Sequence, residues 1–476
     1  MKGFWSVFTQ EWVILKHNST WWIILGLLVV LTVLAALNGA ARTDQMAEMA
    51  ESLNREETVL QSALQTSVER WEANPDSPPP SAASPGALGL SVLSHYTVLP
   101  PTPLAALSIG QTDVQPTYYK VSAHPALTFL NETEIQNPLN VLSGSFDVAF
   151  IIVFVLPIFI VALTFDLMSK EKERGVLSLV LAHGVSKIAF IVAKGTARAA
   201  LIFLLLLVVG FVAVSLTEQS LASAAVWGRF GLWFLVVSFY AFFWFALALF
   251  VNAWGKPSVT NGMILANLWL VFVVVVPALV NVVATTLFPA PSRVELTTEM
   301  REATEIADQE AAESREAFFF DHPEMAGASA NTDQFFLQVL ATDSAVEKAT
   351  QALLEEFELQ AARRQQVVDL LQFISPAIMT QNALNAISGT GTERFSDFVN
   401  QMLVFHEDWR DFFTDRVLKG DLMTSADFEK IPAFEYETWT ISDVFKSTIG
   451  PTVGLTIFML ILGVWSSRRY ARYPVV

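Results

Sequence analysis

Two apolar segments with a short charged segment between them occupy residues 146–195, FDVAFIIVFVLPIFIVALTFDLMSKEKERGVLSLVLAHGVSKIAFIVAKG. Residues 146–168 are long enough to cross the hydrocarbon core of a bilayer as a helix, and a second such segment starts at residue 189. Residues 169–188 between them carry lysines, glutamates and an arginine. The stretch therefore predicts two membrane spans joined by a short polar turn.

Long uncharged segments recur along the chain and predict six spans in all. The chain has 476 residues, of which 53% are hydrophobic and 16% charged. The predicted spans are residues 21–40, 146–168, 189–216, 230–251, 259–287 and 447–465. Pro157 and Pro277 fall inside two of them, where proline is tolerated and kinks the helix. We expect an α-helical polytopic membrane protein with six transmembrane helices.

The distribution of charge predicts the orientation of these spans. With both termini and residues 169–188 and 252–258 on one side, that side and the nearest span residues hold twelve Lys and Arg but four Asp and Glu. The whole chain has a net charge of −17, so the other side is strongly acidic. Basic short loops mark the cytoplasm. We expect a bacterial plasma (inner) membrane protein whose termini are cytoplasmic and whose large domain is external, or periplasmic. The acidic balance argues against a nucleic-acid partner.

The two ends of the chain are both predicted to be cytoplasmic. Residues 1–20 place Phe4, Phe8, Trp12 and Leu15 at helical spacing, which favours a helix lying in the membrane interface. An early start of the first span is the alternative. Residues 466–476 form a basic cytoplasmic tail.

The first long loop, residues 41–145, is expected to be external. Apolar residues recur at helical spacing in its first part and predict that the helix of the first span continues into water. Residues 74–86, NPDSPPPSAASPG, predict a linker or mobile loop without regular structure. Residues 97–99 and 118–121 are short apolar pieces that suit strands or extended segments.

The second long loop, residues 288–446, is expected to be external and mostly helical. Helices are predicted over residues 299–320, 332–373 and 393–418, with a break at Gly389 and Gly391. The middle helix takes its apolar faces from Leu353, Leu354, Phe357, Val367, Leu370 and Leu371. Loops of this size can bury a core. We expect the two loops to pack together into one mostly helical external domain.

The polar turn at residues 169–188 has an apolar face of its own. Val176, Leu179, Val180 and His183 lie at i, i+3, i+4 and i+7 of a helix, and Leu177 and Leu181 widen that face. The charged run KEKER precedes it, and Gly184 is a plausible terminator. Two interpretations are open. The turn either docks into a soluble partner and passes its motion to both spans, or rests on the membrane surface.

The pattern around this turn carries a family resemblance. An acid-rich turn follows a span, then come a glycine, a run of leucines, a small-residue turn with serine and a basic residue, and a Lys-Gly in the next span. The matching positions here are Glu171, Glu173, Gly175, Leu177, Leu179, Leu181, Val185, Ser186, Lys187, Lys194 and Gly195. The chain resembles the permease subunits of type-2 ABC exporters, in the subgroup with a large external domain. Gly175-Val176-Leu177 replaces the usual Gly-Thr-Leu, and Gly184 replaces the usual proline.

The resemblance extends weakly beyond the turn. Asn137-Pro138, Gly144 and Asp147 precede the second span as they do in that subgroup, and Ser375-Pro376 and Gly389-Thr390 have similar surroundings. The resemblance implies that residues 169–188 form a coupling helix on a separate cytoplasmic ABC ATPase. The ATPase-coupling residues that it implies are Glu171, Glu173, Gly175, Leu177, Leu179, Val180, His183, Ser186 and Lys187. Glu171 and Glu173 are expected to meet basic residues of that ATPase.

The resemblance also implies the other subunits. A second permease half, which is the same chain or a related one, completes the transporter, and an external partner protein is a further expected partner. Export is the first interpretation. In a second, the ATPase moves the external domain and no substrate crosses, and in a third the spans merely anchor an external binding module.

Catalytic chemistry is not expected in this chain. It has no G-x-x-x-x-G-K-[ST] phosphate loop, so ATP and Mg²⁺ are expected in the separate ATPase. The scattered histidines predict no metal site, and we expect no cofactor. Asp166 and Asp147 near the ends of the second span are expected to be solvated. Asn261, Asn267 and Asn281 in the fifth span either line a pathway or bond between helices, and we favour the second.

Overall fold

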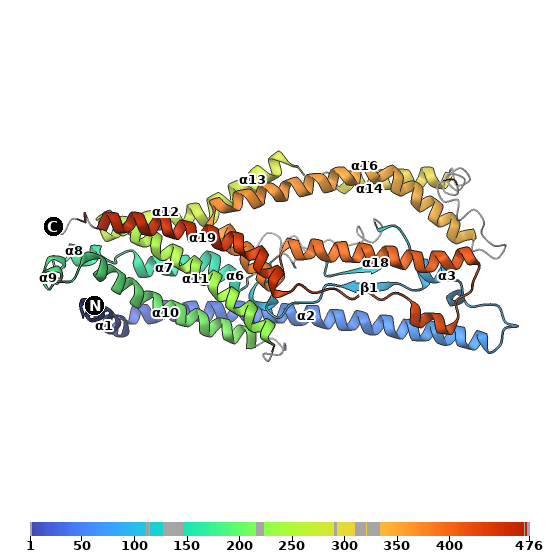
Figure 1. Cartoon of the computed structure of the whole chain (residues 1–476), viewed down its shortest axis with the longest axis horizontal. Coiled ribbons are helices and arrows are strands. Elements are labelled where there is room, and N and C mark those ends of the chain that lie inside the picture. Colours follow the sequence, from blue (N-terminus) through green and yellow to red (C-terminus); the bar gives the residue numbers. More distant parts are fainter. Residues whose placement is uncertain are drawn as a thin grey trace.

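The computed structural model describes residues 2–110, 112, 115–126, 146–215, 223–289, 293–309, 320, 334–470 and 472–473. The molecule is elongated and almost entirely helical, with a bundle of apolar helices at one end and an extramembrane domain at the other (Figure 1). Asn137, Pro138 and Gly144, which belong to the predicted resemblance, lie outside the described residues.

In the part of the chain that the structure describes, six helices are long and apolar enough to cross a membrane, which confirms the predicted fold class of a multi-pass helical membrane protein. The first lies in α2 (Ser19–Glu72), and the second is built from α6 (Val148–Phe150) and α7 (Leu156–Thr164). The remaining candidate spans are α10 (Lys187–Ser215), α11 (Ala224–Asn252), α12 with α13 (Ser258–Trp269 and Val276–Leu287) and α19 (Ile441–Tyr470).

The second and fifth spans each contain a wide π-helical turn directly before the proline. The turn η4 (Ile151–Val155) precedes Pro157, and the turn η5 (Leu270–Val275) precedes Pro277. Proline has no N–H to donate and clashes with the carbonyl one turn earlier, so a locally widened helix accommodates it. At both prolines, where a kink is predicted, the helix has a π-bulge in its backbone hydrogen bonding.

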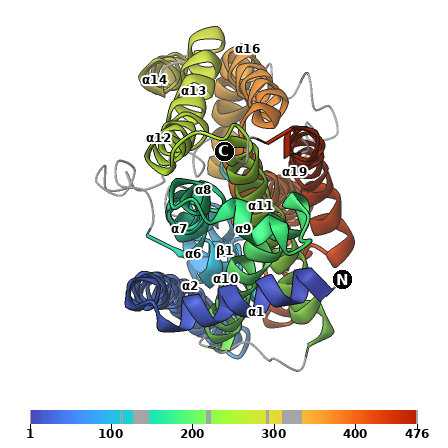
Figure 2. The ribbon, with the colours of Figure 1, turned by 90° about the vertical axis from the view of Figure 1, so that its left-hand side faces the viewer.

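The chain begins with a separate helix, α1 (Lys2–His17). Figure 2 shows α1 crossing one end of the bundle, where it packs on α10. The same end carries α8 (Ser169–Glu173), α9 (Leu177–Ala182) and the last turns of α19 (Figure 1). We call it the turn end of the bundle.

The extramembrane domain has one apolar core to which both long loops contribute. The helix α2, which has 54 residues in all, continues without a break from the first span into this domain, as predicted. The strands β1 (His95–Val98) and β2 (Tyr118–Val121) pair antiparallel, and α18 (Thr392–Lys419) packs in the same core. Val68, Leu88 and Tyr119 of the first loop and Phe398 and Trp409 of the second all belong to it.

The prediction that residues 74–86 lack regular structure is wrong for their second half. A short turn spans Ser81–Ala83, and α3 spans Pro85–Ala87. Ala82 and Ala83 are buried in the domain core. Small residues let these short turns pack closely, and the Ser84 side chain accepts a hydrogen bond from the Ala87 N–H at the start of α3.

The second loop contributes two long helices that pack on each other, α14 (Arg293–Gln309) and α16 (Gln334–Leu371). Residues 310–319 of the predicted helix 299–320 lie outside the described residues, as do the side chains of Leu353, Leu354 and Phe357. Leu370 is 73% exposed, so the expectation that it builds a core is wrong.

One helix of the second loop lies among the spans, which the sequence did not predict. The helix α17 (Pro376–Ser388) belongs to the same apolar cluster as the spans, through residues such as Met379, Leu384 and Ile387. Ser375 caps its start, since its hydroxyl accepts from the Ile378 N–H. Gly389, at φ 65°, ends it in the left-handed conformation that glycine adopts freely.

Candidate functional site

The turn between the second and third spans consists of two short helices with a glycine between them. Gly175 joins α8 to α9 at φ 70°, and Gly184 follows α9 at φ 82°. Both conformations are costly for residues with a Cβ, although no atom lies within 4 Å of where a Cβ on either glycine would sit. Gly184 therefore ends the helix as predicted, and Gly175 makes a bend rather than a close approach.

The apolar residues of α9 divide into an inward and an outward set. Leu177 is buried, and Val180 and Leu181 pack beside it on an apolar cluster formed by Leu167, Met168, Phe190, Ile191, Ala253, Tyr470 and Tyr473. Val176 and Leu179 are 40% and 62% exposed, and His183 is exposed next to them. The predicted single apolar face is thus split, and one side anchors the turn while the other is open.

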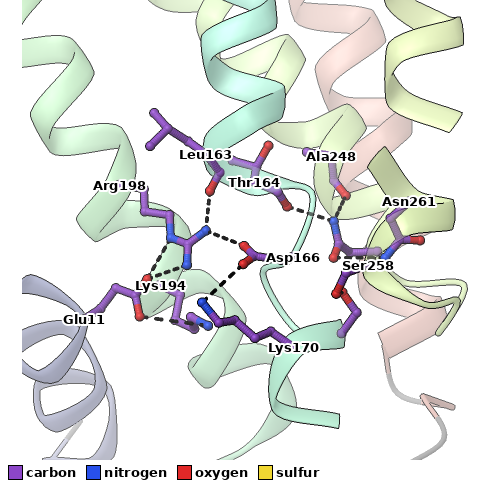
Figure 3. A network of polar contacts seen from close by, with 12 residues as sticks. Glu11, Leu163, Thr164, Asp166, Lys170, Lys194, Arg198, Ala248, Ser258 and Asn261 are labelled. Carbon is purple, nitrogen blue, oxygen red and sulfur yellow. Dashed lines mark hydrogen bonds and ion pairs between the residues drawn. The ribbon is translucent and has the colours of Figure 1, made fainter. Parts of the chain in front are cut away.

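A network of charged side chains lies behind the turn, at the turn end of the bundle (Figure 3). The Arg198 guanidinium of α10 donates to Glu11 of α1 over 2.7 Å and to Asp166 over 2.9 Å. It also donates to the Leu163 carbonyl. Arg198 is only 4% exposed. Its planar fork of donors suits two carboxylates at once, so one side chain fixes α1 and the end of the second span to α10.

The network continues to the turn through a lysine one helical turn earlier on α10. The Lys194 ammonium donates to a Glu171 carboxylate oxygen over 2.7 Å and lies 3.9 Å from Glu11. Lys194 is 2% exposed. The Lys170 ammonium lies 3.7 Å from Asp166. Three carboxylates thus face three cations, which limits the cost of burying the charges.

Glu171 and Glu173, which are expected to meet an ATPase, both have partners within the chain. Glu171 is bound to Lys194, and Glu173 accepts the Ser258 N–H over 2.6 Å at the start of α12. A carboxylate at a helix N-terminus satisfies an unpaired N–H and the helix dipole. The two glutamates therefore connect the turn to the third and fifth spans within the chain.

Ser186 and Lys187 also bind within the chain. The Ser186 hydroxyl accepts the Ala189 N–H and caps α10, and the Lys187 ammonium donates to the Tyr473 carbonyl over 2.7 Å. Burial raises the pKa of the Tyr473 phenol to about 12, and the Glu171 and Glu173 carboxylates add to the rise. The turn thus also holds the segment after α19.

The three asparagines of the fifth span have different surroundings. Asn261 is fully buried and donates to the Asn252 side chain of α11 over 3.4 Å and to the Lys256 carbonyl. Asn252 donates in turn to the Thr164 carbonyl at the end of the second span. Asn267 and Asn281 are exposed, and the Asn267 amide bonds to its own helix at Met263. Bonding between helices therefore holds for Asn261 and not for Asn267.

Sequence reasoning missed several members of the network. Glu11, Arg198 and Asn252 were not singled out, although an acid in an apolar helix and two cations four residues apart in a span are signals of buried ionic partners. Asp166 and Asp147 were expected to be solvated, and that is wrong. Asp166 is bound by Arg198, and Asp147 accepts the Phe150 and Ile109 N–H groups, so it caps the second span.

The arrangement has the chemistry of a mechanical link. Its charged side chains are paired with one another, and no group of three His, Asp or Glu side chains placed to hold a metal ion occurs among the described residues. The turn is joined to α10, α12 and the segment after α19 by separate contacts. The turn is therefore tied to two helices and to the segment that follows a third.

Comparison with known proteins identifies one region of the chain. Residues 293–437 match the model of a family described as a domain of unknown function (DUF3526). The matched region comprises α14, α16, α17 and α18, and thus lies away from the turn and its charged network. A search of curated proteins gave no match.

Proposed function

We propose that this chain is the permease subunit of an ATP-driven ABC exporter and that its α8–α9 turn binds a separate cytoplasmic ATPase. The observation that carries the proposal is the divided surface of α9. Leu177 and Val180 anchor the turn to the bundle, while Val176, Leu179 and His183 are open to a partner. Such a helix receives force on one side and delivers it on the other.

The contacts behind the turn support transmission to the spans. Glu171, Glu173 and Lys187 connect it to the third span, to the fifth span and to the segment after the sixth. The Arg198 pairs join the same region to α1 and the second span. ATP and Mg²⁺ bind in the partner, which carries out the hydrolysis. A second permease half completes the transporter in the bacterial plasma membrane, with the turn end in the cytoplasm.

A single substitution tests the docking surface. The full chain, tagged and purified from its host membranes, should bring with it vanadate-sensitive ATP hydrolysis. Leu179→Asp should lower that activity at least about tenfold, because a charge opposes an apolar contact. Ser178→Asp, which places the same charge on the same helix but beside the patch, should keep it. Equal hydrolysis in the two variants would contradict the docking role.

The continuous helix α2 favours a second candidate function, in which force reaches the extramembrane domain and no substrate crosses. Its 54 residues extend about 80 Å from the first span into the domain core. A proline at Ala50 breaks α2 beyond the span. If this second function holds, the wild-type chain in proteoliposomes should show no export, and Ala50→Pro should abolish the ATP-dependent movement of the extramembrane domain, followed by spin labels on Ser62→Cys and Ser467→Cys. If the chain exports a substrate, export should survive Ala50→Pro.

A further inference from the structure

The helix α17 has one face that protein covers only in part. Nine of its thirteen residues are buried. The four half-buried residues are Ile378, Gln381, Asn382 and Ala386. Ile378, Asn382 and Ala386 are spaced four residues apart, so they form one line along the helix, and Gln381 lies beside them. A helix packed among spans on all other sides thus leaves one open track.

Two cavities meet on that track. The first, of about 490 Å³, lies against Ile378, Gln381 and Asn382, and its opposite walls are apolar residues of the second and fifth spans, such as Phe154 and Pro277. The second, of about 410 Å³, lies against Asn382 and Ala386. Asn382 lines both, and each volume is within the range of ligand sites.

The two cavities differ in polarity. The charged residues that line the second are Asp369, Glu393, Arg394 and Lys446, which are two acids and two bases. Trp439 also lines it, next to the start of α19. The first cavity has Asp147 as its charged residue, and both carboxylate oxygens of Asp147 accept backbone N–H groups. An apolar cavity and a cavity with balanced charge therefore share Asn382 in their walls.

The cavities lie at the boundary between the spans and the extramembrane domain. Asp147 caps the first turn of the second span, and Lys446 and Pro451 belong to the first turns of α19. Both helices have their other ends at the turn end. At this depth hydrocarbon meets headgroups, and tryptophan is favoured.

We propose that the track along α17 binds a zwitterionic phospholipid of the leaflet on the side of the extramembrane domain. One acyl chain occupies the apolar cavity, the headgroup occupies the charged cavity, and Asn382 contacts the glycerol region between them. The order of apolar and polar compartments along the track matches the order of groups along such a lipid. The site is independent of ATPase docking, which concerns the opposite end of the bundle.

Photochemical capture tests the site. The full chain is placed in nanodiscs that contain phosphatidylethanolamine with a diazirine in one acyl chain, irradiated, digested and mapped by mass spectrometry. The adduct should concentrate on α17 and on the facing residues of η4 and η5. Ile378→Trp fills the apolar cavity and should lower this adduct at least about tenfold, and so should Ala386→Trp in the charged cavity. Val274→Trp, on the exposed side of the fifth span, should leave it unchanged.

Two further measurements decide between a phospholipid and other occupants. A diazirine fatty acid without the headgroup should label α17 at least about tenfold less, and equal labelling would overturn the proposal. The chain has no cysteine, so Asn382→Cys reports on a second copy. A disulfide-linked dimer formed on oxidation in nanodiscs would show that another chain covers the track, and would also overturn it. Adduct levels equal to those of the wild type in both Ile378→Trp and Ala386→Trp would also overturn the proposal.

Discussion

The bundle is held together by charge at one end and by apolar packing at the other. At the turn end, Arg198 and Lys194 join α1, the second span and the turn through buried ion pairs. At the opposite end, α17 packs Met379 and Leu384 against the spans, and aromatic rings pack on one another in the domain core. Apolar packing fixes a body through many weak contacts.

Ion pairs connect elements through few contacts, so each contact matters more. A buried pair adds little net stability compared with apolar packing, yet removal of one partner leaves an uncompensated charge. The turn end is therefore suited to helices that move relative to one another as rigid bodies. The α17 end is suited to helices that keep their positions. The two ends should therefore respond differently to substitution.

The largest effect should come from Arg198→Met. Glu11 and Asp166 would remain buried without their shared cation, and we expect a loss of about 3–5 kcal/mol in the free energy of unfolding. The measurement is the thermal midpoint of tryptophan fluorescence in detergent. Arg174→Met, at an exposed position beside Gly175, should change little. Adding Glu11→Gln and Asp166→Asn to Arg198→Met should recover part of the loss. Equal midpoints for Arg198→Met and Arg174→Met would show that buried charge does not hold the turn end together.

The sequence predicted the spans and missed what connects them, for physical reasons. Hydrophobic length is a local property, so the six spans are recognisable one by one. Glu11 and Arg198 are 187 residues apart in the chain, and no local pattern announces their pairing. The helix α17 has 13 residues and includes Thr380, Gln381 and Asn382. It is too short to be predicted as a span, and only its packing places it among them.

The stability of the domain core should depend on pH through His406, which lies far from the turn end. Burial lowers the pKa of His406 to about 4, and the nearby Arg410 charge adds to the effect. Its Nε2 donates to the His124 carbonyl over 2.7 Å. Because the folded pKa lies below the unfolded value of about 6.5, the unfolded chain takes up the proton first, and stability falls as pH drops from about 6.5 towards 4.

The expected loss from His406 is about 2 kcal/mol between about pH 7 and pH 5. Thermal midpoints at the two pH values measure it. His406→Gln keeps a donor but does not titrate in this range, so the difference between the two pH values should shrink. Ser178→Ala, on the surface of α9, should keep the wild-type difference. A wild-type pH dependence in His406→Gln would assign the effect to other groups.

A smaller effect should follow loss of the cap on α17. The Ser375 hydroxyl accepts the Ile378 N–H over 3.3 Å and donates to the Phe272 carbonyl over 2.9 Å, in the π-helical turn of the fifth span. Ser375→Ala should lower the free energy of unfolding by about 1 kcal/mol. Ser467→Ala, whose exposed hydroxyl bonds to Val464 in its own helix, is the matched control. If both variants melt alike, α17 is held by packing alone.

The smallest effect on stability should come from Glu173, although it joins the turn to the fifth span. Its carboxylate caps α12 at the Ser258 N–H, but the residue is exposed, so Glu173→Gln should cost a few tenths of a kcal/mol and Glu173→Ala about 0.5–1 kcal/mol. The informative measurement is ATP hydrolysis by the complex that co-purifies with the chain. If the turn drives the fifth span through this contact, Glu173→Ala should keep the partner bound while hydrolysis no longer responds to the membrane subunit. Glu173→Gln retains an acceptor for the N–H and should preserve the response. An unchanged response in Glu173→Ala would leave Glu171 and Lys194 as the connection from the turn to the spans, and the turn end would then act through its buried charges alone.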